Sequence, residues 1–259
     1  MGTYSSATRQ GAYEPFELQV ARGQVDGHKT LFKFGINGDV GTSVETVWAQ
    51  GGTYAYPASA TVMKISSSSA DDASGGTGAR TIAIFGLDAN YNEISESVLL
   101  DGQTAVNTGN SYLRISRMYV TTAGSGATAV GTIYAGTGTV TSGVPATVYG
   151  MIAIGANQTQ MAFWTVPAGY TLYLMGVYFT SANSTANAST NFQLIQRPLG
   201  GVFRIQSSAR TAGNGDFVFD LHTPLAFTEK TDIEIRAIAS AGASNVSAEF
   251  EGIYIKNPD

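Results

Sequence analysis

The residues with the clearest chemical potential lie in one stretch, FGLDANYNEISESVLLDG, over residues 85–102. Asp88, Asn90 and Asn92 occupy alternate positions, and two glutamates follow them. Oxygen-bearing side chains at alternate positions are typical of the start of an EF-hand calcium loop, and paired carboxylates can act as general acid and base. The stretch therefore offers a metal loop, an acid/base pair or only the turn of a hairpin.

Spacing decides between these interpretations. An EF-hand loop that begins at Asp88 needs Gly at its sixth position and Glu at its twelfth, where this chain has Glu93 and Leu99. Glu93 and Glu96 are three residues apart, so on a strand they point to opposite faces. Because Asp and Asn tolerate left-handed backbone, Leu87 to Glu93 is predicted to be a hairpin loop. A weak cation site, and a glycosidase in which one glutamate works with a distant Asp, stay open as alternatives.

Other catalytic patterns are missing from the sequence. The two histidines, His28 and His222, lie in different halves of the chain, and there is no cysteine. No Gly-x-Ser-x-Gly elbow and no Gly-Lys-Ser/Thr phosphate loop occurs. We therefore expect no catalytic residue, no metal ligand and no cofactor, and the chain is predicted not to be an enzyme.

The composition excludes two classes of partner. Only 13% of the 259 residues are charged, the net charge is −5, and Lys and Arg form no cluster. Binding to nucleic acid through phosphates, or to an acidic membrane surface, needs such clusters. No apolar run approaches the length of a membrane span. The expected partners are therefore neither nucleic acid nor membrane.

The pattern of elements predicts an all-β fold with two β-sandwich domains. Short alternating segments separated by Gly- and Asn-rich turns begin near residue 59 and continue to the end of the chain. The Gly/Thr/Ser-rich segment 135–146 is taken as the boundary, which gives a first sandwich over 51–140 and a second β domain over 147–259. The second domain contains about eight short strands, the number in a jelly roll.

Residues 1–50 show little alternation and are predicted to form an irregular N-terminal arm. Such an arm packs on its own domain or grips a neighbouring subunit, and its removal is expected to leave a folded remainder. Its apolar anchors, the predicted contact residues, are Phe16, Leu18, Phe32, Phe34 and Trp48.

Aromatic side chains offer a further binding hypothesis. The chain has 13 Tyr, and Tyr and Trp often form platforms for sugars, although in a β protein they also reflect strand packing and subunit contacts. The candidate glycan platform consists of Tyr54, Tyr56, Tyr91 and Trp164.

The first half of the chain carries a recognisable order of motifs. Over roughly residues 14–135 it reads PFELQVARGQVDGHKTLFKFGINGDV, then ETVWAQGGTYAYPASA, then ARTIAIFGLDANYNEISESVLLDGQTAV, then NSYLRISRMYVTTAGSGATAVGTI. This block resembles one that recurs in virion structural proteins of tailed bacteriophages, especially marine ones. The second half is similar only in architecture to the jelly-roll modules common on virion surfaces.

The resemblance implies a non-enzymatic virion protein that decorates or cements the capsid, with the major capsid protein as its partner. It also implies a symmetric homo-oligomer, commonly a trimer, on the outer capsid surface. Synthesis in the host cytoplasm is expected, since the N-terminus lacks the apolar core of a secretory signal and the chain has no cysteine. The alternative is a head-fibre or tail component that binds a host-surface glycan. No catalytic residues come with the resemblance.

Overall fold

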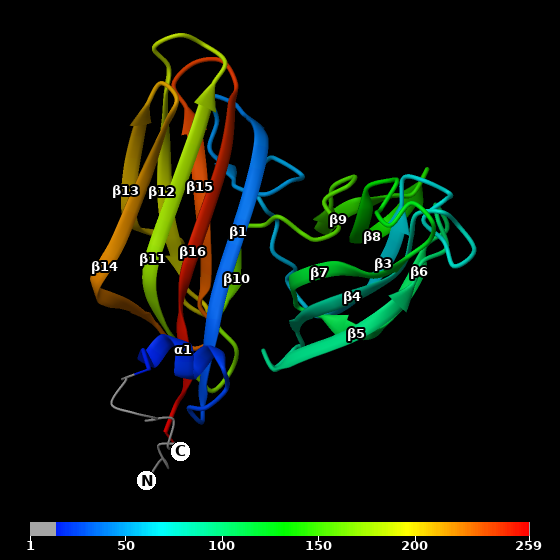
Figure 1. Ribbon diagram of the computed structural model, residues 1–259, viewed down its shortest axis with the longest axis horizontal. Helices are drawn as coiled ribbons and strands as arrows, with labels where there is room; N and C mark the ends of the chain where they lie inside the picture. The colour runs from blue at the N-terminus through cyan, green and yellow to red at the C-terminus, as the bar shows by residue number, and fades with distance from the viewer. Residues whose placement is uncertain (1–13, 259) are drawn as a thin grey trace.

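The computed structural model describes residues 14–258, and regular structure in this range is almost entirely β (Figure 1). The elements are α1 (Phe16–Ala21), β1 (His28–Val40), β2 (Glu45–Thr46), β3 (Thr61–Ser67), β4 (Ala79–Leu87), β5 (Glu93–Leu99), β6 (Val106–Tyr112), β7 (Arg114–Ala123), β8 (Ile133–Thr141), β9 (Val144–Ile152), β10 (Phe163–Thr165), β11 (Tyr170–Asn183), β12 (Ser189–Arg197), β13 (Arg204–Ala212), β14 (Gly215–Phe227), β15 (Asp232–Ala239) and β16 (Ser244–Lys256). The prediction of an all-β fold is confirmed.

Eight of these strands form a jelly roll. One sheet has the order β1-β16-β11-β14, and the facing sheet has the order β10-β15-β12-β13, with β2 added beside β15. In chain order within this domain, the first strand pairs with the eighth, the second with the seventh, the third with the sixth and the fourth with the fifth, all antiparallel. Such nested pairing is that of a long hairpin rolled into two sheets, the jelly-roll topology. Phe179, Phe192 and Phe250 are buried between the sheets.

The other domain, named the inserted domain, lies in the chain between the first two strands of the jelly roll, β1 and β10. Strands β3 to β9 form two sheets of order β6-β3-β8-β9 and β5-β4-β7, with Met63, Ile84 and Met118 in their shared core. Figure 1 shows this domain beside β1, to one side of the elongated jelly roll. The chain therefore leaves the jelly roll after β2 and returns to it at β10.

The expectation of an irregular N-terminal arm is wrong for residues 28–40. These residues form a long strand that pairs with β16 from His28↔Ile255 to Val40↔Ser244. Local alternation does not reveal the strand, because its buried face carries Lys33 and Asn37 while Phe32 points out. Deleting the first 50 residues would remove a core strand, so no folded remainder is expected. Residues 1–13 lie outside the described range.

The predicted boundary at 135–146 is also wrong. This segment contains the turn of the β8–β9 hairpin, in which Ser142 and Gly143 have φ values of 50° and 79°. Two consecutive residues in the left-handed region are the requirement of a tight type I′ hairpin turn. The Gly/Thr/Ser-rich composition thus marks a turn within the inserted domain, which extends to Ile152.

The two connections between the domains lie side by side. Trp48 and Met161 form a β-bridge, and the amide of Ala49 donates to the carbonyl of Gln160 at 3.0 Å. Adjacent ends are the geometry that lets one domain be inserted into another. The connections are packed by an aromatic cluster made of Trp48, Tyr54, Tyr56, Tyr149, Met161, Phe163 and Val148.

A buried ionic network joins the inserted domain to the jelly roll. Arg114 on β7 donates to both carboxylate oxygens of Asp232 on β15, at 2.9 and 3.1 Å. The same carboxylate accepts from Arg197 and from the hydroxyl of Thr165. The guanidinium groups of Arg114 and Arg197 lie 4.9 and 4.6 Å from the ring centre of Tyr56. A planar, bidentate contact of this kind fixes orientation as well as distance.

Asp232→Asn should destabilise the protein strongly. The substitution leaves the guanidinium groups of Arg114 and Arg197 without their carboxylate, and breaking a buried pair in this way costs about 3–5 kcal/mol. Urea unfolding of the variant measures the loss. Asp26→Asn, at an exposed position, is the matched control and should change the free energy of unfolding by about 0.5 kcal/mol or less. Equal losses in the two variants would contradict the role of the network.

Candidate functional site

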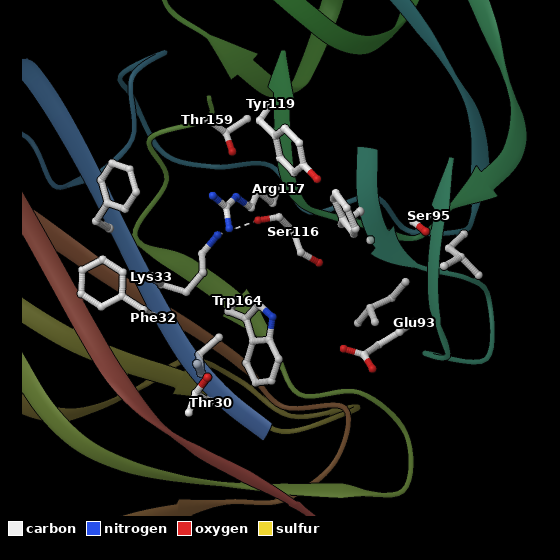
Figure 2. A pocket seen from close by; sticks show the side chains of 16 residues that line it. Thr30, Phe32, Lys33, Glu93, Ser95, Ser116, Arg117, Tyr119, Thr159 and Trp164 are labelled. Atoms are coloured by element: carbon white, nitrogen blue, oxygen red, sulfur yellow. Dashed lines mark hydrogen bonds between the residues drawn. The ribbon is translucent and has the colours of Figure 1, made fainter. Parts of the chain in front are cut away.

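A pocket of about 650 Å³ lies between the two domains. Strands β1 and β10 of the jelly roll form one wall, and β4, β5 and β7 of the inserted domain form the other (Figure 2). Its volume is within the range of small-ligand sites, which is about 300–1,000 Å³. The walls belong to segments far apart in the sequence, so the pocket depends on how the domains are held together.

Lys33 is the most unusual residue of this pocket. Its side chain is only 8% exposed, and its ammonium group donates to the backbone carbonyl of Ser116 at 2.6 Å. Burial and, to a smaller extent, the nearby positive charge of Arg117 lower the pKa of Lys33 to about 7. Within the described part of the chain, Lys33 forms no salt bridge with a carboxylate.

Arg117, Trp164 and Glu93 complete the polar side of the pocket. The Arg117 guanidinium lies 5.3 Å from the ring centre of Tyr119 and donates to the side-chain oxygen of Gln158 at 2.9 Å. The indole of Trp164 projects from β10 toward the space between the walls (Figure 2). Glu93 stands on the opposite wall, where it forms an ion pair with Lys29. The pocket thus combines cations, an indole N–H and aromatic surface.

The stretch that began the sequence analysis is a hairpin, as predicted. Strands β4 and β5 pair antiparallel with Leu87 opposite Glu93. Asp88 accepts hydrogen bonds from the backbone amides of Asn90 and Asn92 at 2.8 and 2.9 Å, and these bonds lower the pKa of its carboxyl group despite partial desolvation. The carboxylate therefore stabilises the turn.

The two glutamates of that stretch have separate structural roles. Glu93 bonds to Lys29 and Tyr254 of the jelly roll, whereas Glu96 accepts the amides of Gly109 and Asn110 within the inserted domain. They share no substrate position. In the described range, His, Asp and Glu side chains form no cluster that could hold a metal ion, and no helix is long and apolar enough to cross a bilayer.

The five predicted contact residues differ in exposure. Phe16, Leu18 and Phe32 are exposed, and Phe32 is the most exposed of them at 57%. Phe34 is half-buried in the same strand. Trp48 is buried in the aromatic cluster between the domains, so it cannot contact a partner directly. The three exposed side chains remain candidates.

The four predicted platform residues do not form one surface. Tyr54 is buried against Trp48, and Tyr56 is half-buried next to the guanidinium groups of Arg114 and Arg197. Tyr91 belongs to the β4–β5 turn, where its φ is 66°. Trp164 is separate from them and lines the pocket. The buried Tyr54 cannot belong to an exposed glycan platform, and Trp164 lines the pocket between the domains instead.

An exposed apolar edge of the jelly roll was missed by the sequence analysis. Phe217 and Phe219 on β14 lie opposite the buried residues Phe179 and Val177 on β11, so they point toward the sandwich interior. They are nevertheless 37% and 39% exposed. The inward residues of neighbouring β13 are small, such as Ala209, and leave the interior incompletely covered. The alternation of apolar and polar residues in β14 predicted a strand, but it could not show that the inward side chains of this strand remain partly exposed.

Comparison with known proteins gives little further guidance. No protein-family model matches the chain, and no curated protein matches it in sequence. Among solved structures, the VP2 subviral particle of infectious bursal disease virus shares 10% identity, with 89% of this chain and 72% of that chain covered and a TM-score of 0.24. The structure of the Gx strain of that virus shares 10% identity, with 89% and 76% covered and a TM-score of 0.25. At such TM-scores the likeness carries no weight, and the jelly-roll assignment depends on the strand pairing.

The pKa of Lys33 predicts how stability depends on pH. The pKa is about 7 in the folded chain against an ordinary value of 10.5, so the unfolded chain binds more protons between these values. The free energy of unfolding therefore rises with pH across this window, and the cost of burying the charge is complete below pH 7. Lys33→Met should stabilise the protein most below that pH and progressively less toward pH 10.5. Urea unfolding at about pH 6, 8 and 10 checks this trend, and a constant difference would contradict it.

Proposed function

We propose that this chain is a non-enzymatic structural protein of a tailed-phage virion, which decorates or cements the capsid as a closed ring of identical copies. The sequence block of the first half and the jelly-roll topology support a virion role. The observation that carries the proposal is a pair of exposed apolar surfaces at opposite sides of the jelly roll, one on β13 and β14 and the other on α1 and β1.

The first surface is named the β13–β14 edge. These two strands end their respective sheets, on the side of the jelly roll away from the inserted domain (Figure 1). Long apolar edge strands promote pairing with other chains unless something covers them. The exposed apolar residues of this surface and of the loop before it are Leu199, Val202, Ile205, Phe217, Val218 and Phe219.

The second surface is named the α1–β1 surface and consists of Phe16, Leu18 and Phe32. Strand β1 ends the same sheet that β14 ends at the other margin. When two different surfaces of one protein contact each other between copies, the contact is heterologous, and repetition of it closes a ring if the rotation allows. A trimer is the smallest such ring and the one that we expect.

Mixing two variants tests the heterologous contact. The double variant Phe217→Ser/Phe219→Ser removes apolar side chains from the β13–β14 edge. The double variant Phe16→Ser/Leu18→Ser removes them from the α1–β1 surface. Each variant should be monomeric, because a ring needs both surfaces, whereas an equimolar mixture should form a 1:1 dimer through the one intact contact of the pair. Sedimentation velocity and native mass spectrometry measure these states. Ile154→Ser, at an exposed apolar residue of neither surface, should leave the oligomer of the unchanged protein intact.

Two results would contradict this contact. A monomeric unchanged protein would remove the basis for self-association. An α1–β1 variant that keeps the full oligomer would show that the β13–β14 edge contacts itself across a two-fold axis.

Copy number tests the virion role independently. Quantitative mass spectrometry of purified virions should find on the order of hundreds of copies of this chain per virion, a number similar to that of the major capsid protein. Many copies are expected because cementing a lattice depends on many repeated contacts. A few copies would contradict capsid decoration. They would favour the second candidate, a head-fibre or tail component that binds a host glycan, for which the pocket between the domains is the supporting observation.

A further inference from the structure

We propose that the pocket between the domains binds an acidic sugar, a sugar ring that bears a carboxylate. The carboxylate lies against Lys33 and Arg117, and the ring hydroxyls bond to Trp164 and Glu93. This inference concerns a small-ligand site and does not depend on ring formation or on capsid binding.

The charged side chains that line the pocket favour the binding of an anion. Lys33 and Arg117 contribute two positive charges, and neither forms a salt bridge within residues 14–258. The carboxylate of Glu93 is already neutralised by Lys29. Burying a charge without a partner is costly, so an anion that reaches Lys33 gains strong stabilisation. Three donor hydrogens on the ammonium group, of which the Ser116 carbonyl takes one, leave two for a carboxylate.

The remaining polar groups of the pocket, the indole N–H of Trp164 and the carboxylate of Glu93, favour a ligand with hydroxyl groups. Trp164 is 7% exposed, and its indole N–H has no hydrogen-bond acceptor among the described residues. The residue lines the pocket, so this N–H can donate to a ligand bound there. Glu93 faces it from β5 and offers carboxylate oxygens that accept hydrogen bonds from hydroxyls. A sugar ring carries hydroxyls that can accept from the indole and donate to the glutamate.

The distribution of charge and aromatic surface favours a carboxylate on a ring over a compact phosphate. A phosphate could reach the cations but would leave the indole N–H of Trp164 without an acceptor. The stacked rings of Phe85 and Tyr119, 5.5 Å apart, add apolar surface on the inserted-domain wall. Sugar rings pair their apolar C–H faces with such surfaces, and the volume of about 650 Å³ admits a ligand of this size.

Calorimetric titration with four probes tests the site. Glucuronate carries both features, glucose has the ring without the carboxylate, acetate has the carboxylate without the ring, and inorganic phosphate is a compact anion. At about pH 6, where Lys33 is protonated, glucuronate should bind at least about tenfold more tightly than each of the other three. Oligouronides of increasing length then distinguish a free acidic sugar from the end of a polymer.

Variants connect the binding to the pocket. Lys33→Met should weaken glucuronate binding about tenfold or more, because it removes a charged hydrogen bond and keeps the length of the side chain. Trp164→Phe retains the aromatic body without the N–H and should weaken it several-fold. Lys64→Met, at a lysine of β3 outside the pocket, is the control and should bind as the unchanged protein does.

Three outcomes would overturn the inference. Glucuronate that does not bind, or that binds Lys33→Met as tightly as the unchanged protein, excludes this site. Acetate or phosphate that binds as tightly as glucuronate shows that the pocket recognises an anion alone.

Discussion

The carboxylate of Asp232 is the contact on which the relation between the two domains depends. It receives Arg114 from the inserted domain and Arg197 from the jelly roll, and it is almost completely buried. Arg114 begins β7, the strand that also carries Ser116 and Arg117. Fixing the start of β7 therefore places a carbonyl over Lys33 and a second cation beside it, which creates the pocket.

Local patterns predicted the features that local interactions determine. The prediction of a hairpin around Asp88 was correct because the turn is stabilised by hydrogen bonds between that side chain and the backbone amides of Asn90 and Asn92. The jelly roll of the second half was predicted from its succession of short strands. Its first strand was missed, because β1 buries Lys33 and exposes Phe32, the reverse of the usual pattern. Lys33 is buried by β7, a strand of the inserted domain that lies more than 80 residues later in the chain. Local sequence patterns cannot predict a contact between residues so far apart.

The same limitation applies to the functional surfaces. Trp48 and Tyr54 are aromatic residues of the kind that form binding sites, but the connections between the domains bury them. Phe217 and Phe219 alternate as core residues do and are half-open only because β13 presents small side chains to them. Whether an aromatic residue packs inside or faces a partner depends on what the rest of the fold places over it.

The chain has a low content of charge, exposed apolar residues at two sides of the jelly roll and a pocket lined by Lys33 and Arg117, and we propose that its contacts are made through these surfaces. An electron cryomicroscopy reconstruction of the virion that resolves individual strands tests this account most directly. The account predicts closed rings on the outer capsid surface, with the β13–β14 edge of each copy against the α1–β1 surface of the next. A particle that lacks the chain, or rings joined through the inserted domains with both apolar surfaces facing solvent, would contradict it.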